Sequence, residues 1–346
     1  MPLPEYSTFT VALPASTANA VTELPTTDAS VTARTVAQTG LPAWKAALTK
    51  YTMMMFILGM CVSLPLTLWP QKLLYKLKLI NRVRKERWAL ATGQGCARWM
   101  LRIFPFCSLD AQGYHDPNPQ PTIWACNHTS MLDVFLLLAA DRALRGPHKR
   151  PIKIVYWRGL ETNPVTRLLF RQAGFIAVNM ADNGNGTANE YDRASFKTFL
   201  RETKQAFVDG FDIGILPEGQ LNPTPEKGLL PVFSGAYTIA KLSKRPMSLM
   251  ALHGAHRLWH PDDAIGMTVT GRNVSVRSYP GTRVYTSADE FVQTFQHVVG
   301  HFGTYGVDLP RPKLRSWLNG SAYAQLQQQL QDDDQQSPQS PAVDTL

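Results

Sequence analysis

The segment Pro121–Ala140, with the sequence PTIWACNHTSMLDVFLLLAA, decides the fold of this chain. It begins with an apolar, β-prone run that ends at Cys126 and continues into a short polar sequence. It ends with a Leu- and Ala-rich run from Val134 that favours a helix. The pattern therefore predicts a strand, a loop and a helix, the arrangement in which α/β proteins place their functional residues.

The predicted loop and helix carry a histidine and an aspartate at a spacing that brings them together. His128 lies on the loop, and Asp133 lies about one turn into the helix. Because helical side chains lean toward the N-terminus, we expect the Asp133 carboxylate to contact the imidazole and make its free nitrogen a stronger base. The alternative is that Ser130 and Asp133 form only a capping box, and that His128 has no catalytic role.

A second motif, Ile213–Gly219 (IGILPEG), is an apolar run that ends in a turn containing Glu218. Together, the His-x4-Asp pattern and the later Pro-Glu-Gly resemble the glycerolipid acyltransferases of the 1-acyl-sn-glycerol-3-phosphate (lysophosphatidate) acyltransferase type. Residues 153–178 resemble that family's strand, proline-containing helix and Gly-x-Ile strand, and residues 246–257 resemble its last block. The resemblance covers about residues 85–290.

The chain departs from the family pattern at two places. Gln220-Leu221 stand where the family usually has Thr-Arg, and Asn179-Met180 stand where it usually has an arginine. Both positions are linked in the family to the phosphate of the acceptor. The departures leave the acyl-transfer residues in place, but they leave the acceptor open.

The resemblance implies that a fatty acyl group moves from acyl-CoA to a free hydroxyl of lysophosphatidic acid, which gives phosphatidic acid in phospholipid biosynthesis. His128 is then the general base and Asp133 orients it. The implied acceptor-binding residues are Asn127, Glu218 and Gly219, with phosphate contacts expected from Lys153, Arg158 or Lys227. A surface position without a role in binding is the alternative for each of the last three.

The expected partners are membrane lipids and acyl-CoA, or an acyl carrier protein, as co-substrate. We expect no bound cofactor and no metal. Three alternatives stay open: an acyltransferase that remodels another lysophospholipid or acylates glycerol 3-phosphate, an inactive membrane lipid-binding protein, and a hydrolase that uses the same histidine and aspartate. No Gly-x-Ser-x-Gly sequence is present, which argues against a serine hydrolase.

Charge and histidine spacing point away from two other classes of protein. The formal net charge of +9 predicts an anionic partner, yet no zinc-finger spacing or arginine-rich arm indicates nucleic acid. His253, His256 and His260 have a spacing that superficially fits a metal site. They follow a predicted strand beside Gly254 and Pro261, so one helix is not expected to present all three.

Residues 51–70 (YTMMMFILGMCVSLPLTLWP) carry no charge and correspond to about 30 Å of helix, one hydrocarbon thickness. The segment predicts either a transmembrane span or a re-entrant helix, and a buried helix of a soluble protein is the alternative. The dense lysines and arginines of residues 72–87 place the following domain in the cytosol and favour anionic headgroups. We expect the endoplasmic reticulum membrane, with a plastid membrane as the alternative.

Alternating strands and helices predict an α/β fold with a mostly parallel central sheet flanked by helices and an N-terminal membrane-embedded helical anchor. The expected order is a disordered arm over residues 1–42, the anchor and a basic helical segment over 43–100, the acyltransferase domain over 101–318, and a disordered polar tail over 319–346.

Overall fold

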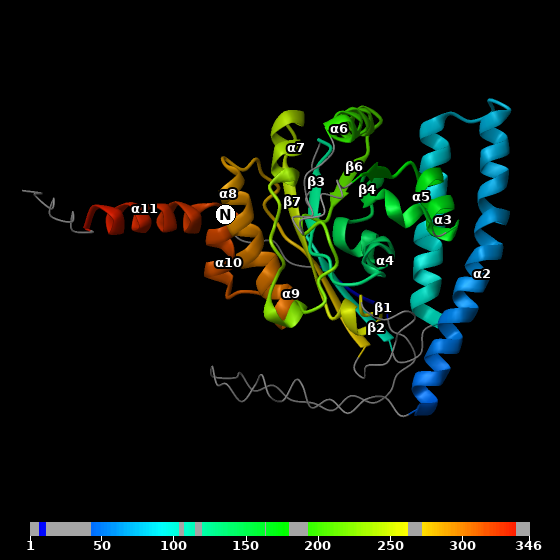
Figure 1. Ribbon diagram of the computed structural model, residues 1–346, viewed down its shortest axis with the longest axis horizontal. Coiled ribbons are helices and arrows are strands. Elements are labelled where there is room, and N and C mark those ends of the chain that lie inside the picture. The colour runs from blue at the N-terminus through cyan, green and yellow to red at the C-terminus, as the bar shows by residue number, and fades with distance from the viewer. Residues whose placement is uncertain are drawn as a thin grey trace, which may run out of the picture.

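The computed structural model describes residues 7–11, 43–103, 107–114, 120–162, 164–179, 193–261 and 272–336. Its strands form one sheet in the order β1-β2-β8-β7-β3-β6-β4-β5 (Figure 1). The strands are β1 (Ser7–Val11), β2 (Cys107–Gly113), β3 (Ile123–Cys126), β4 (Ile152–Trp157), β5 (Ile176–Val178), β6 (Asp212–Ile215), β7 (Met247–His253) and β8 (Arg272–Ser278). The principal helices are α2 (Ala43–Lys76), α3 (Arg82–Ile103), α4 (Asp133–Arg145), α5 (Pro164–Ala173), α6 (Arg193–Val208), α7 (Gly235–Ser243), α8 (Ala288–Phe295), α9 (His301–Tyr305), α10 (Arg311–Leu318) and α11 (Ser321–Gln336).

The sheet is mostly parallel, as the sequence predicts. Strands β3, β4, β5, β6 and β7 pair in parallel with their neighbours in the centre of the sheet, and β2 is parallel to β8. Antiparallel pairing occurs between β7 and β8 and between β1 and β2. The α/β class is therefore confirmed.

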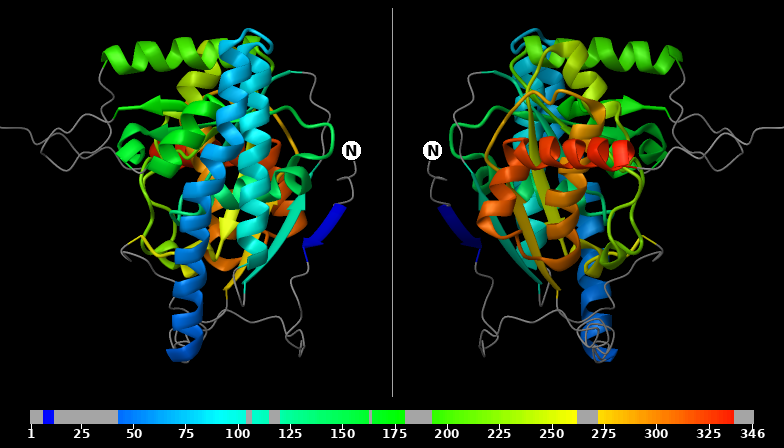
Figure 2. Two further views of the ribbon diagram at one scale, coloured as in Figure 1. Left: turned by 90° about the vertical axis from the view of Figure 1, so that its right-hand side faces the viewer. Right: turned by 90° about the vertical axis from the view of Figure 1, so that its left-hand side faces the viewer.

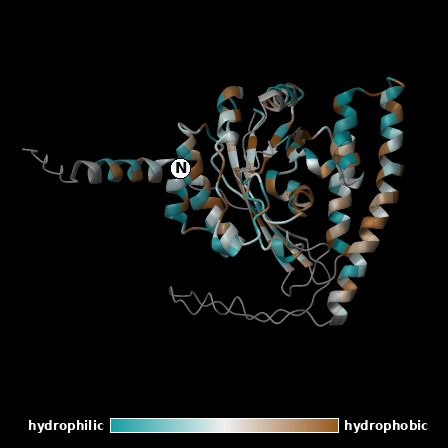
Figure 3. Cartoon of the chain, viewed as in Figure 1, coloured by the Kyte–Doolittle hydropathy of each residue, from teal (hydrophilic) through white to brown (hydrophobic). Residues whose placement is uncertain are grey.

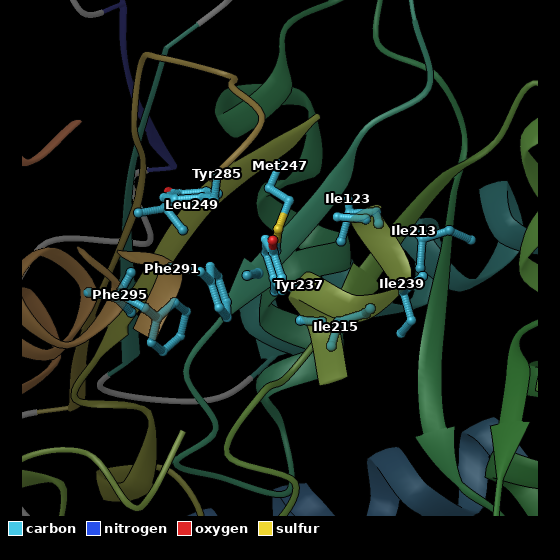
Figure 4. Packing of buried hydrophobic residues seen from close by; sticks show 14 of the residues in the cluster. Ile123, Ile213, Ile215, Tyr237, Ile239, Met247, Leu249, Tyr285, Phe291 and Phe295 are labelled. Carbon is cyan, nitrogen blue, oxygen red and sulfur yellow. The ribbon is translucent and has the colours of Figure 1, made fainter. Parts of the chain in front are cut away.

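Helices cover both faces of the sheet. On one face, aromatic residues of α8 and α9 pack against the central strands together with residues of α6 and α7, and Figure 4 shows part of this cluster. The other face packs against α4, whose Leu136 and Leu138 are almost fully buried. Helices α3 and α5 pack beside α4, and α2 forms the outermost layer (Figure 1).

Strand register brings the two sequence motifs to the same edge of the sheet. In the central strands, Ala125 of β3 lies opposite Ile215 of β6, and Cys126 lies opposite Met250 of β7. His128 follows β3 by two residues, and Glu218 follows β6 by three. Since parallel strands end at a common edge, both residues lie beyond the carboxyl ends of neighbouring strands.

Helices α2 and α3 form an antiparallel hairpin along the outside of the domain (Figure 2). One stripe of α2 is buried against the domain through Met60, Leu64 and Leu68. An opposite stripe leaves large apolar side chains exposed, namely Met55, Leu58, Val62, Leu66 and Trp69. The helix is apolar over much of its length (Figure 3), and its segment Lys50–Lys76 is long and apolar enough to cross a membrane.

Buried ion pairs attach the hairpin to the sheet. Lys153 of β4 contacts Glu86 of α3, with 2.7 Å between Nζ and Oε2, and both residues are at most 5% exposed. Arg82, also on α3, contacts both Glu86 and Asp209. A buried charge left unpaired is costly, so these contacts fix the position of α3 against the sheet.

Three parts of the sequence behave differently from expectation. The predicted disordered arm contains β1, which pairs with β2, and the predicted polar tail contains the helix α11. The sequence did not predict β2 as a strand, because its residues CSLDAQG alternate burial without a strongly apolar run. A strand expected at residues 267–270 and the departure at Met180 lie outside the described residues.

Candidate active site

Asp133 organises the loop that precedes α4. Its Oδ2 accepts hydrogen bonds from the backbone amides of Thr129, at 2.5 Å, and Ser130, at 2.9 Å. The same oxygen lies 2.9 Å from Nδ1 of His128. The capping and histidine-orienting interpretations of Asp133 are therefore both correct, since one carboxylate oxygen does both.

His128 is held so that one ring nitrogen remains available. An ionised carboxylate can only accept hydrogen bonds, so Nδ1 of His128 carries the proton and donates to Asp133, and Nε2 presents its lone pair. Nε2 has no hydrogen-bond partner within the described residues, and the side chain is 21% exposed. This geometry is that of a general base with an oriented imidazole, although its catalytic role is a prediction.

Glu218 holds the backbone of His128 in place. It is fully buried, and its Oε1 accepts the backbone amide of His128 at 2.7 Å. Its Oε2 accepts the backbone amide of Leu230 at 2.9 Å. Burial raises the pKa of Glu218 to about 7. The family resemblance implied that Glu218 binds the acceptor. Because both of its carboxylate oxygens instead accept hydrogen bonds from the protein's own amides, Glu218 positions His128 and does not line an open acceptor pocket.

Two further polar residues tie the His128 loop to its neighbours. The backbone amide of Asn222 donates to the carbonyl of His128 at 2.8 Å, and its side chain donates to the carbonyl of Gly228. Ser130 Oγ donates to the carbonyl of Trp259 at 2.8 Å, after β7. The sequence analysis missed Asn222, although Asn222-Pro223 is a turn signal directly after the Pro-Glu-Gly motif.

Asn127 and Lys153 do not lie where an acceptor ligand would meet them. Asn127 is fully buried, and both polar atoms of its amide bond the backbone of Leu252, which joins β3 to β7. Lys153 lies opposite Ile213, which lies opposite Ile123, at the amino ends of the strands. Its ammonium is paired with Glu86, so the expectation that Lys153 contacts an acceptor phosphate is wrong.

The other expected residues lie at the same edge of the sheet as His128, beyond the carboxyl ends of the strands. Arg158 directly follows β4 and Lys227 lies in the loop after Glu218, and both are exposed. Gly219 forms the turn after Glu218, with a positive φ of 68° that only glycine adopts readily.

Arg257 is a cation at this edge that the sequence analysis did not single out as a contact. It lies in the short 3-10 helix Ala255–Arg257 after β7, two residues before Trp259. Its guanidinium has no hydrogen-bond or ion-pair partner within the described part of the chain, and the residue is half-buried. A positive charge of this kind beside the His128 loop is suited to binding an anionic substrate group.

The backbone amides at the start of α4 are candidate donors for stabilising a tetrahedral oxyanion. Those of Thr129 and Ser130 are bound to Asp133, and that of Leu132 donates to Ser130 Oγ. The amide of Met131 has no partner within the described residues. Met131 is therefore the candidate donor that the geometry of this turn retains.

Of the three histidines at the end of β7 and in the loop after it, His253 and His260 make separate contacts. His253 Nδ1 lies 2.9 Å from the carbonyl of Gly303, and His260 Nε2 lies 2.9 Å from that of Pro223. Burial lowers the pKa of His256 to about 4. Among the described residues, no group of histidine, cysteine and carboxylate side chains is arranged to hold a metal ion.

Comparison with known proteins links this geometry to a family. A family model described as Acyltransferase matches residues 111–251, the segment that includes both motifs. A search of curated proteins finds no match. A similar solved structure is the crystal structure of the 1-acyl-sn-glycerophosphate (LPA) acyltransferase PlsC from Thermotoga maritima, which is 15% identical, with a TM-score of 0.53 over 75% of this chain and 94% of that chain. The structural likeness supports the fold, and the segment that carries His128, Asp133 and Glu218 matches the sequence pattern of the Acyltransferase family.

Proposed function

We propose that this chain is a membrane-bound acyltransferase that moves a fatty acyl group from acyl-CoA to a free hydroxyl of lysophosphatidic acid and so forms phosphatidic acid for phospholipid biosynthesis. The observation that carries the proposal is the contact between His128 and Asp133 on an acyltransferase-family domain, with Nε2 of the imidazole left available. The acceptor named for the Thermotoga maritima enzyme, LPA, supports the choice of substrate.

In the proposed reaction, Nε2 of His128 removes the proton of the acceptor hydroxyl as its oxygen attacks the thioester carbonyl. Asp133 stabilises the imidazolium that forms, because its Oδ2 holds Nδ1 at 2.9 Å. The carbon–sulfur bond then breaks, and the leaving thiolate takes the proton back from the imidazolium. A thioester is reactive enough for direct attack, so the mechanism requires no covalent acyl-enzyme.

The acceptor phosphate would meet cations at the edge of the sheet that carries His128. Arg158, Lys227 and Arg257 all follow strands at that edge or lie in its loops. Gln220 and Leu221 cannot form the bidentate contact that an arginine gives to a phosphate. This departure favours a second candidate function, the acylation of another lysophospholipid or of glycerol 3-phosphate.

The exposed apolar stripe of α2 supports membrane attachment of the enzyme. The basic residues after the span support a cytosolic position for the catalytic domain. We propose the endoplasmic reticulum as its membrane, with a plastid membrane as the alternative. The acyl donor in this proposal is acyl-CoA, with an acyl carrier protein as the alternative carrier.

A lipid-product assay tests the proposal. Detergent-purified full-length protein is incubated with oleoyl-CoA and, separately, with lysophosphatidic acid, lysophosphatidylcholine or glycerol 3-phosphate. We expect phosphatidic acid from the first acceptor, and a loss of about 10²- to 10⁴-fold in rate for His128→Ala. His148→Ala is the matched control, because His148 is an exposed histidine outside the site.

Two results would contradict the proposal. If His128→Ala turns over substrate at nearly the wild-type rate, His128 is not the general base. Release of free fatty acid without any acylated acceptor would instead identify a thioesterase.

A further inference from the structure

A cleft lies between α2 and α5, away from both catalytic loops. Its volume is about 570 Å³, which falls within the range of ligand pockets, roughly 300–1,000 Å³. Its apolar wall comes from Met60, Leu64 and Pro65 of α2 and from Leu168 of α5. None of the residues that line it belongs to the His128 or Glu218 loops, so it is separate from the candidate active site.

Three cations line the cleft. Lys72 comes from α2, and Arg167 and Arg171 come from α5. Arg171 is paired with Glu161, and this contact lowers the pKa of Glu161 to about 2. Lys72 and Arg167 form no ion pair within the described residues, so two positive charges remain available for a ligand.

The cleft also contains an unpartnered amide. Gln172 lines it, and the Oε1 atom of Gln172 is enclosed without any hydrogen-bond partner. An enclosed polar atom without a partner costs free energy. Rotation of the Gln172 side chain toward the cleft would let a hydroxyl group of a bound ligand satisfy this atom.

The cleft opens beside an apolar surface. Val62 and Leu66 of α2, next in sequence to cleft residues, are more than half exposed. A ligand held by the cations could therefore continue as hydrocarbon along α2, where water would otherwise cover apolar side chains. Cations, an unpartnered amide and an adjoining apolar surface together describe an amphipathic anion.

We propose that the cleft between α2 and α5 binds an anionic phospholipid with a hydroxyl-bearing headgroup, of the phosphatidylglycerol class, from the surrounding bilayer. The phosphate lies between Lys72 and Arg167, the headgroup hydroxyls reach Gln172, and the acyl chains follow Met60, Leu64 and the exposed stripe of α2. The lipid is bound without being consumed, and it fixes the domain against the membrane by joining α2 to α5. This inference rests on the proposed membrane attachment, but it goes beyond the proposed acyl transfer and does not depend on that activity.

The test measures thermal unfolding of the full-length protein in one neutral detergent. Dioctanoylphosphatidylglycerol is titrated against dioctanoylphosphatidylcholine and against inorganic phosphate. We expect a saturable rise in Tm with phosphatidylglycerol only, because the choline lipid has no net charge and free phosphate lacks the apolar part. An equal response to both lipids, or a response to phosphate alone, would overturn the proposal.

Substitutions locate the binding. Arg167→Gln and Lys72→Gln should each weaken the phosphatidylglycerol response about tenfold, because each removes a charge-assisted contact to the lipid phosphate. Arg201→Gln is the matched control, because Arg201 is an exposed arginine on α6. His128→Ala should keep the response. If the double variant Lys72→Gln/Arg167→Gln keeps the wild-type response to phosphatidylglycerol, the lipid binds elsewhere. The same conclusion would follow if His128→Ala lost the response.

A measurement on the wild-type protein covers variants that fail to fold. Cys61 is exposed and lines the cleft, whereas Cys96 lies outside it. Phosphatidylglycerol should slow maleimide modification of Cys61 relative to phosphatidylcholine, with Cys96 unaffected. Equal modification rates of Cys61 in the two lipids would contradict the proposed site.

Discussion

Buried carboxylates at the two ends of the sheet have different partners. At the carboxyl ends of the strands, Asp133 and Glu218 are fully buried and bind backbone amides and an imidazole. At the amino ends, Glu86 and Asp212 bind cations, Lys153 at 2.7 Å and Arg145 at 2.6 Å. Within the described residues, neither Asp133 nor Glu218 forms an ion pair with a lysine or an arginine.

The difference separates stability from chemistry. When a carboxylate is paired with a lysine or an arginine, the two opposite charges offset each other. Such a pair fixes two elements together and leaves no net negative charge for a reaction. Asp133 is held by backbone amides without a paired cation, and its carboxylate can therefore stabilise an imidazolium on His128. Substitutions at the two ends should consequently affect different measurements.

The largest effect is expected at Asp133. Asp133→Asn can keep the acceptor oxygen that binds the amides of Thr129 and Ser130, because the second carboxylate oxygen has no partner to lose. The negative charge facing His128 is lost, and we expect turnover to fall by about 10²- to 10⁴-fold. Initial rates at saturating substrates and Tm measure the two roles separately. Lost stability with retained turnover would show that Asp133 acts only as a cap.

At the opposite end, Lys153→Met should reduce stability and leave catalysis intact. The substitution leaves Glu86 buried with only Arg82 beside it, and breaking a buried pair costs roughly 3–5 kcal/mol. Because Arg82 remains, we expect the free energy of unfolding, measured with denaturant, to fall by about 3 kcal/mol. The double variant Glu86→Leu/Lys153→Met should recover most of this loss. A fall in turnover per folded molecule would contradict the separation of the two ends.

These two ends also differ in how far the sequence predicts them. The loop with His128 and the turn with Glu218 each follow an apolar run, so strand ends and motif residues were both visible in the sequence. The contact between Asp133 and His128 followed from the lean of helical side chains. The pairing of Lys153 with Glu86 joins residues 67 positions apart, and no local pattern predicts it.

The same limit explains the errors in the site. Asn127 and Glu218 stand in the motifs, but their side chains turn toward the backbone of Leu252 and Leu230, which only the folded chain brings near. Lys153 stands in a strand, and its position along the strand decides which edge of the sheet it reaches. Arg257 ends the weak block 246–257, which does not by itself indicate a contact, and the register of β7 places it at the active edge.

The pH dependence of stability tests the raised pKa of the buried Glu218 carboxyl group. Its pKa in the folded protein is about 7, above the value of about 4.3 in an unfolded chain, so the folded state holds more protons between these pH values. The free energy of unfolding should therefore fall as pH rises from about 4.3 to 7, by up to about 3 kcal/mol from this group. Denaturant unfolding at a series of pH values measures the slope.

Glu218→Gln is the matched variant for that slope. Glutamine has nearly the same shape and does not titrate, so the contribution of this group to the pH dependence should disappear. The variant is expected to be less stable at every pH, because its NH₂ group faces the donor amide of Leu230 or His128. An unchanged slope in the variant would mean that Glu218 stays ionised throughout this range.

The smallest effect is expected at Arg257, and it tests whether the active edge supplies its own cation to a substrate. Arg257→Gln should raise the apparent KM for lysophosphatidic acid about tenfold, because one charge-assisted contact is lost. The kcat and the KM for acyl-CoA should change little, since Arg257 has no bond to His128, Asp133 or Glu218.

Arg257→Lys should recover part of the affinity, because it keeps the charge and loses the bidentate geometry. Arg142→Gln, on the exposed side of α4, is the matched control. If KM for lysophosphatidic acid stays unchanged in a folded Arg257→Gln protein, the acceptor phosphate lies on the side of Arg158 and Lys227 instead, and the cation after β7 has no part in choosing the acceptor.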